Sequence, residues 1–270
     1  MAIEELLTRR ILSGIEATPL AEERLQALVR SAKQGHLCND LEDSSWIPKS
    51  LWSEGEEKTP LVVHRKKLYL QRNWALESLL LQKFLGFTSF PAEEISLPNN
   101  LQPAQEAAIR KALGKQLSIF TGGPGTGKTF TASCFIRALA ERSSRPYRVA
   151  IAAPTGKAAA HLENALRAQG TLPLQLEIES TTLHRLLKLS PSSQRLVDQQ
   201  EIPKDLVVID EASMLDALLM LHLFNGIGPN TRLLLLGDPD QLPPIEGGGV
   251  FADMAELVGS KLERSMRTDN

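Results

Sequence analysis

One stretch of the sequence decides the fold: Gly122-Gly123-Pro124-Gly125-Thr126-Gly127-Lys128-Thr129. It fits the pattern G-x-x-x-x-G-K-[ST], which is typical of a loop that wraps phosphate groups. Glycines let successive backbone N–H groups converge on one anion without a clash from a Cβ atom. Lys128 adds a mobile positive charge for the β- and γ-phosphates, and the Thr129 hydroxyl can ligate Mg²⁺. The stretch therefore predicts a site for a nucleoside triphosphate.

The sequence on either side supplies the strand and the helix that such a loop requires. Residues 116–121 are short and apolar enough for a buried strand, and the residues after the loop have helical periodicity. The apolar positions of that helix are Phe130, Cys134, Phe135, Ala138 and Leu139. A helix that begins here points the positive end of its dipole at the same anion. The alternative is a plain glycine-rich turn, and the flanking strand and helix argue against it.

The composition is that of a globular protein. The chain has 270 residues, 42% of them hydrophobic, and a formal net charge of −2. This charge argues against a broad basic surface but still allows a basic groove for nucleic acid. Cys38 and Cys134 fit no metal-ligand spacing, which suits a reduced thiol state. We see no signal peptide and no apolar run of membrane-spanning length, so we expect a cytoplasmic protein with no membrane partner.

A Pro/Asn-rich joint, Leu97-Pro98-Asn99-Asn100, marks a boundary between two regions of the chain. Residues 1–96 predict a smaller, mostly α-helical domain, with loop or short helices at 40–60 and two short strands around a basic turn at 61–70. Residues 97–270 predict alternating helices and apolar strands, which implies an α/β domain with a parallel sheet covered on both faces. Within it, Thr182–Leu189 is interpreted as a helix. Ligands of such sheets bind beyond the carboxyl ends of the strands.

Two further strand ends of the second region carry polar residues. The apolar run 206–209 delivers Asp210, a candidate ligand for Mg²⁺, and Glu211 can orient or deprotonate an attacking water. Acids at a helix N-terminus are the alternative interpretation, since the dipole favours them there. Gln241, in the loop after the strand 232–236, can hydrogen-bond the γ-phosphate or the attacking water, although alone it would be an ordinary Pro/Asp turn.

Two more segments are weaker signals. Residues 153–159, APTGKAA, end another strand and open a helix with small residues and Lys157, a cradle suited to a backbone phosphate of nucleic acid. A tightly packed strand–helix turn explains this segment equally well. In residues 181–185, TTLHR, His184 can simply fill a polar niche.

Taken together, these motifs resemble those of superfamily-one DNA helicases, and in particular the RecD type found in RecBCD-type exodeoxyribonuclease V. The resemblance rests on Thr121–Thr129, the AAPTGKAAA run, the STTLHRLL run, VVIDEASM and GDPDQLPPIEGG. Segments of the N-terminal region, Gly35–Cys38 and Leu68–Trp74, also look similar to that family. The likeness covers nearly the whole chain. It implies a RecA-like P-loop NTPase domain at 97–270, preceded by a partner-docking domain at 1–96.

The resemblance also implies roles for individual residues. Residues Gly122–Thr129 would hold ATP, and Thr129 and Asp210 would hold Mg²⁺, with Glu211 as the catalytic base. Gln105 would read the adenine edge, and Lys128, Gln241 and Arg267 would act on the γ-phosphate. The residues implied to contact single-stranded DNA are Pro154, Thr155, Lys157, Thr182 and His184.

The function implied is that of an ATP-dependent 5′-to-3′ DNA helicase subunit acting at duplex ends in double-strand break repair, with RecB-like and RecC-like partners. RecD-type helicases continue into a second RecA-like domain, whereas this sequence stops at Asn270. Because translocation needs two domains that close around ATP, we expect a fragment, a split gene product or a decayed gene product with weak hydrolysis of its own. Two alternatives remain: a non-catalytic ATP-binding scaffold subunit and an RNA helicase of the same superfamily.

Overall fold

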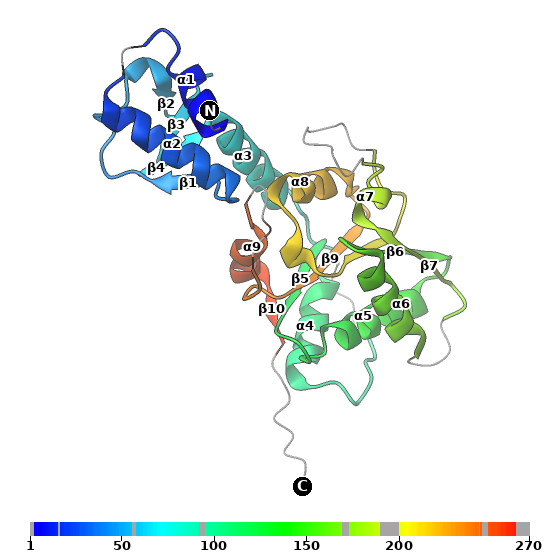
Figure 1. The fold of residues 1–270 in the computed structure, drawn as a ribbon. Helices are drawn as coiled ribbons and strands as arrows, with labels where there is room; N and C mark the ends of the chain where they lie inside the picture. Colours follow the sequence, from blue (N-terminus) through cyan, green and yellow to red (C-terminus); the bar gives the residue numbers. More distant parts are fainter. Residues whose placement is uncertain are drawn as a thin grey trace. The chain divides into compact units, whose positions relative to one another are not determined.

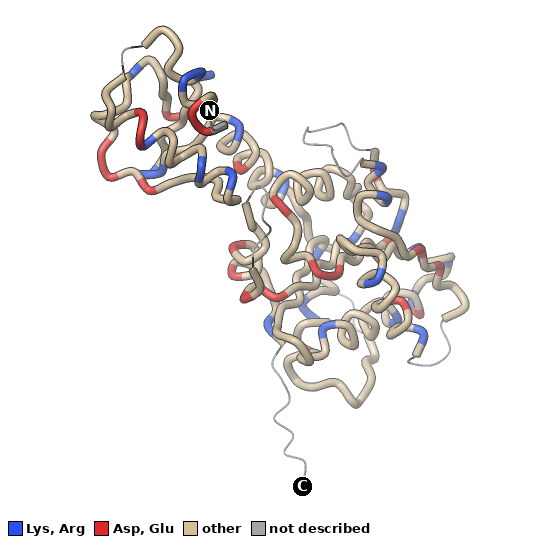
Figure 2. The backbone as a smooth tube through the Cα atoms, viewed as in Figure 1, with Lys and Arg blue, Asp and Glu red and all other residues tan. Residues whose placement is uncertain are grey.

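The chain forms two compact units in the computed structural model. The structure describes residues 3–15, 17–55, 58–91, 95–168, 173–189, 200–242, 244 and 248–262. The first unit comprises Met1–Lys83, Asp216–Leu221 and Pro243–Gly249, and the second comprises Phe84–Leu215, His222–Leu242 and Val250–Asn270. The sequence-based boundary between residues 96 and 97 remains a prediction. Basic and acidic residues are both scattered over the described parts of the two units (Figure 2).

The first unit combines helices with a small sheet (Figure 1). Its elements are α1 (Ile3–Ile11), α2 (Pro19–Lys33), β1 (Cys38–Asp40), η1 (Lys49–Leu51), β2 (Trp52–Ser53), β3 (Leu61–His64), β4 (Lys67–Leu70) and α3 (Gln71–Leu85). The described strands form a four-stranded sheet in the order β1-β4-β3-β2. The expectation of a mostly helical region is therefore only partly right, because pairing across the chain stabilises the short strands β1 and β2, which carry little local signal.

Local signals explain the remaining elements of the first unit. Thr18 caps α2, since its hydroxyl accepts the Ala21 N–H at 3.2 Å, and the proline after it is preorganised for a first helical turn. The predicted strands around a basic turn are confirmed as β3 and β4, and Arg65 and Lys66 in the turn both have positive φ. The core consists of Leu12, Leu25, Leu28, Leu41, Ile47, Leu51, Leu61 and Leu68.

The second unit contains a parallel sheet. Its elements are α4 (Pro103–Leu113), β5 (Leu117–Thr121), α5 (Lys128–Arg142), β6 (Tyr147–Ala153), α6 (Gly156–Ala168), β7 (Leu176–Thr182), α7 (Leu183–Leu186), β8 (Leu206–Ile209), η2 (Ala212–Met214), β9 (Arg232–Gly237), α9 (Phe251–Val258) and β10 (Ser260–Lys261). Helix α8 (Ala217–Gly226) has residues in both units. The described strands form a six-stranded sheet in the order β10-β5-β9-β8-β6-β7, and every pairing is parallel.

Helices cover the sheet of the second unit. Residues of α4, α5 and α6 share one core cluster with alternate strand residues such as Phe120, Ile151 and Leu234. Their strand neighbours Ile119, Ala150 and Leu235 are equally buried on the other face. Phe251 of α9 packs against Gly237, because a Cβ atom there would lie 2.5 Å from its ring. The predicted α/β fold with a buried parallel sheet is confirmed.

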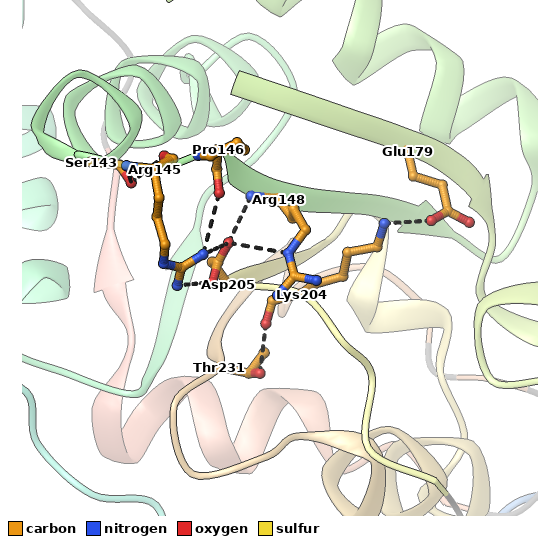
Figure 3. A network of polar contacts seen from close by, with 8 residues as sticks. All are labelled: Ser143, Arg145, Pro146, Arg148, Glu179, Lys204, Asp205 and Thr231. Atoms are coloured by element: carbon orange, nitrogen blue, oxygen red, sulfur yellow. Dashed lines mark hydrogen bonds and ion pairs between the residues drawn. The ribbon is translucent and has the colours of Figure 1, made fainter. Parts of the chain in front are cut away.

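A polar network ties the amino ends of three strands together (Figure 3). The buried carboxylate of Asp205 accepts two hydrogen bonds from the Arg145 guanidinium, at 2.6 and 3.2 Å, and one from the Arg148 N–H at 2.7 Å. The backbone of Asp205 pairs with Arg148 on one side and Arg232 on the other. Burial by itself raises the pKa of Asp205, but these hydrogen bonds and positive charges outweigh it and lower the pKa.

One predicted element of the second region differs from the structure, and strand β7 was not predicted. The expected helix at Thr182–Leu189 is only partly right, because Thr182 ends strand β7 and helix α7 covers only Leu183–Leu186. Strand β7 is stabilised by its long pairing with β6, from Tyr147↔Leu176 to Ala153↔Thr182.

Candidate functional site

The loop between β5 and α5 needs its glycines for steric reasons. Gly122, Gly125 and Gly127 have φ values of 152°, 76° and 83°, a region that favours glycine. A Cβ atom at Gly122 would lie 2.6 Å from the carbonyl oxygen of Leu262. The loop runs from the carboxyl end of a fully buried strand into the first turn of α5 at Lys128. Backbone N–H groups and the helix dipole therefore favour an anion at this position.

The ammonium of Lys128 lies over this loop. Its Nζ donates hydrogen bonds to the carbonyl oxygens of Gly122 and Gly123, the latter at 3.0 Å. Burial lowers the pKa of Lys128, while the negative charges of Asp238 and Asp210 raise it. The structure thus brings one partly desolvated cation and two carboxylates together at the loop.

Strand β8 delivers Asp210 and Glu211 to the same edge of the sheet. Burial raises the pKa of Asp210, and the Glu211 N–H, Lys128 and His161 act in the opposite direction. Oδ1 of Asp210 accepts the Glu211 N–H at 2.9 Å. Glu211 itself adopts the left-handed conformation, with φ 55° and ψ 36°, which costs a non-glycine residue about 1 kcal/mol or more. The chain therefore turns sharply at the residue expected to act as the base.

Asp238 is a site residue that the sequence analysis missed. It follows β9, which the sheet order places between β5 and β8, and it is buried. Its Oδ2 lies 3.9 Å from the position of a Cβ atom at Gly123. Its Oδ1 accepts the Asp240 N–H at 3.1 Å. The polar run after β9 was a signal, but the strand order that brings Asp238 to Lys128 cannot be read from periodicity.

Gln105 lies beside the phosphate loop. It is buried in α4, and its Oε1 accepts the Gln102 N–H at 3.0 Å at the start of that helix. Its Nε2 lies 2.5 Å from where a Cβ atom of Gly127 would be, so glycine is required for this contact. The structure therefore places Gln105 next to the site, and its reading of adenine remains a prediction.

The donors near the loop suit Mg²⁺. Thr129 lies in the first turn of α5, and the desolvated carboxylate of Asp210 would regain stabilisation from a cation. Among the described residues, no group of three or more His, Cys, Asp or Glu side chains could hold a metal ion. Mg²⁺ commonly takes one or two protein oxygen ligands and completes its shell with phosphate oxygens and water.

The five residues expected to contact DNA gather at two neighbouring strand ends. Ala153 of β6 pairs with Thr182 of β7, so the segments that follow the two strands begin side by side. The Thr155 hydroxyl accepts the Ala158 N–H at 3.3 Å, and the Thr182 hydroxyl accepts the Arg185 N–H at 3.4 Å. The five residues, which we call the strand-end cluster, are Pro154, Thr155, Lys157, Thr182 and His184. All are half-buried or exposed.

Two residues predicted to act on the γ-phosphate have different outcomes. Gln241 is exposed, and its amide oxygen accepts a hydrogen bond from the hydroxyl of Ser213 at 3.3 Å. Arg267 lies outside the described residues.

Residues 105–246 match the model of a family described as AAA domain, which is more than half of the chain. A curated RecBCD enzyme subunit RecD from Mycolicibacterium smegmatis is 34% identical over 90% of this chain and 50% of its own length. The chain belongs to the RecD-like superfamily-one helicases.

Other RecD-like relatives give the same result. RecBCD enzyme subunit RecD from Buchnera aphidicola (strain APS) is 34% identical over 73% of this chain and 36% of its own length. An ATP-dependent RecD2 DNA helicase from Deinococcus radiodurans is 38% identical over 58% of this chain and 20% of its own length. The chain therefore spans half or less of the length of these relatives. Among the described residues, no helix is long and apolar enough to span a membrane.

Proposed function

We propose that this chain binds ATP with Mg²⁺ and hydrolyses it weakly, and that it serves as the ATP-binding part of a helicase that moves along single-stranded DNA. The proposal rests on the convergence of Lys128, Asp210 and Asp238 at the glycine loop. The negative charges of both aspartates act on the ammonium of Lys128. This edge of the sheet continues into the strand-end cluster, whose residues are half-buried or exposed. One edge thus offers both an anion site and a surface suited to a nucleic acid strand.

The residues have separate tasks in this reaction. The ammonium of Lys128 exchanges its loop carbonyl partners for the β- and γ-phosphate oxygens, which are stronger acceptors. Glu211 orients or deprotonates the attacking water, and its position is fixed by its left-handed backbone. Asp210 and Thr129 would hold Mg²⁺, which supplies neutralisation of the charge on the phosphate oxygens.

The wider role is inferred from the relatives described above. We propose a 5′-to-3′ DNA helicase subunit of a RecBCD-type exodeoxyribonuclease that acts on duplex ends in double-strand break repair. RecB-like and RecC-like subunits are the proposed partners, since the relatives are RecBCD subunits. The strand-end cluster is proposed to contact the single strand.

The decisive experiment measures ATP turnover of the 270-residue chain with and without single-stranded DNA. We expect ATP binding and weak DNA-stimulated turnover, and Lys128→Ala should abolish the turnover. Lys67→Ala is the matched control, because Lys67 forms an exposed ion pair with Asp40 in the first unit. Binding of ATP without turnover would support a non-catalytic ATP-binding subunit, and no binding at all would refute the proposal. Competition by RNA as effective as by DNA would favour an RNA helicase.

A further inference from the structure

Ser213 is a buried polar residue to which the proposed reaction assigns no role. It lies in η2, two residues after the left-handed Glu211, and only 6% of it is exposed. The turn that carries it is closed by hydrogen bonds from the Met214 N–H to the Glu211 carbonyl and from the Leu215 N–H to the Ala212 carbonyl. The position of Ser213 is therefore tied to that of Glu211.

The hydroxyl of Ser213 donates to Oε1 of Gln241 at 3.3 Å. The backbone of Gln241 is held separately, because its N–H donates to the Asp238 carbonyl at 3.2 Å. Strands β8 and β9, which precede the two residues, are neighbours with Ile209 paired to Leu235. The hydroxyl–amide contact thus links two adjacent strand ends, one carrying Glu211 and the other carrying Asp238.

The direction of this hydrogen bond decides which side of the amide faces outward. A glutamine amide has an acceptor oxygen and a donor NH₂ group on opposite sides of one planar group. When a hydroxyl donates to the oxygen, the NH₂ group is turned away from that hydroxyl. Phosphate oxygens accept hydrogen bonds and cannot donate them when ionised, so only the NH₂ side of the amide can bind them.

We propose that Ser213 is a positioning residue that holds the Gln241 amide with its NH₂ group toward the γ-phosphate of bound ATP. This inference rests on the proposed function and deepens it. The exposed side chain of Gln241 would otherwise sample both amide orientations, of which one presents an oxygen to an anion. Ser213 and Glu211 belong to the same turn. The contact with Ser213 therefore also fixes the position of the Gln241 amide relative to Glu211, the proposed base.

The test compares Ser213→Ala with the wild-type chain in DNA-stimulated ATP turnover. We expect a fall in kcat of about fivefold, the effect of one hydrogen bond, with KM for ATP unchanged. Affinity for ADP should stay the same, whereas affinity for ADP with aluminium fluoride, which mimics the transferring phosphoryl group, should fall by the same factor as kcat. Ser213→Thr keeps the hydroxyl and should restore the rate.

Two variants of Gln241 complete the test. In a Gln241→Ala background, Ser213→Ala should cause no further loss, because its effect passes through the amide. Gln241→Glu still accepts the Ser213 hydroxyl but offers no NH₂ group, so it should lose turnover even with Ser213 intact. This second variant tests the proposal even if Ser213→Ala does not fold.

The outcomes separate the two proposals. A wild-type chain that turns over ATP while Ser213→Ala keeps the full rate overturns the role of Ser213 alone. Equal losses from Ser213→Ala with and without Gln241 overturn it as well, and so does full activity of Gln241→Glu. A wild-type chain with neither turnover nor binding of the analogue overturns the proposed function and this inference together.

Discussion

The two edges of the six-stranded sheet are built on opposite principles. At the amino edge, Asp205 is buried and its carboxylate is satisfied by Arg145 and Arg148, so its pKa is lowered (Figure 3). At the carboxyl edge, burial raises the pKa of Asp210 and lowers that of Lys128, which means that both charged forms are disfavoured. The amino edge thus stabilises the fold, whereas the charged groups of the carboxyl edge are in an unfavourable state that a bound ligand can stabilise.

The largest expected effect separates catalysis from binding at the carboxyl edge. Glu211→Gln should lower DNA-stimulated kcat by about 10²- to 10⁴-fold, the usual contribution of a general base. Its affinity for ATP should stay within about twofold, because the phosphate loop and Lys128 are untouched. Turnover and fluorescent-nucleotide binding measure the two effects. A loss of binding instead would mean that Glu211 has a structural role.

The next effect belongs to the amino edge and should concern stability. Asp205→Ala removes the acceptor of the Arg148 N–H and of the Arg145 guanidinium, which should lower the free energy of unfolding by about 2–3 kcal/mol. Urea unfolding at pH 7 measures this loss. The affinity of the folded fraction for ATP should not change, and an altered affinity would show that the two edges are coupled.

The pH dependence should have opposite signs at the two edges. The lowered pKa of Asp205 contributes stability that is present above its unfolded pKa of about 3.9 and lost as the pH falls through the folded value. Asp205→Asn should therefore flatten the loss of stability below about pH 4. Unfolding midpoints at several pH values test this, and an unchanged acid limb would contradict it.

The raised pKa of Asp210 predicts the reverse. Its charged form is disfavoured by burial, so stability falls as the pH rises from the unfolded pKa through the folded one. Asp210→Asn should raise the free energy of unfolding at pH 7 by about 0.5–2 kcal/mol, as substitutions at strained functional positions often do. It should abolish turnover at the same time. If Asp210→Asn is instead less stable than the wild-type chain, the Asp210 carboxylate stabilises the fold, as that of Asp205 does.

The smallest effect concerns the strand-end cluster. Lys157→Ala should weaken binding of single-stranded DNA by a few-fold and reduce the slope of log affinity against log salt by about 0.7, the release of one counterion. Lys157 is exposed, so stability should be unaffected. Lys67→Ala should leave the slope alone. An unchanged slope for Lys157→Ala would show that Lys157 does not contact the DNA.

The sequence predicted those parts of the site that are local in the chain. The glycine loop with its flanking strand and helix, the start of α4 at Pro103 and the strand before Asp210 are confirmed. Each has its own signal: required glycines, a first-turn proline or a continuous apolar run. Residue roles in binding DNA and adenine remain predictions, since the structure shows where these side chains lie and not what they bind.

The parts that were missed depend on pairing between distant segments. Strand β10 has two residues and exists because Ser260 and Lys261 pair with β5. Asp238 joins the site only because β9 lies between β5 and β8. Strand β7, however, could have been predicted from the sequence. Its apolar residues Leu176 and Ile178, which pack on the core, alternate with Glu177 and Glu179.

The contact between Leu262 and the base of the phosphate loop has a consequence for protein synthesis. The Leu262 N–H donates to the carbonyl oxygen of Thr121 at 2.7 Å, and Gly122 packs against the Leu262 carbonyl. The loop is thus completed by a residue that the ribosome adds 141 positions after Thr121 (262 − 121). At about 5–20 residues per second, this delay lasts about 7–28 s. During that time the nascent chain contains the whole glycine loop but lacks β10 and Leu262, which pair with β5 just before the loop.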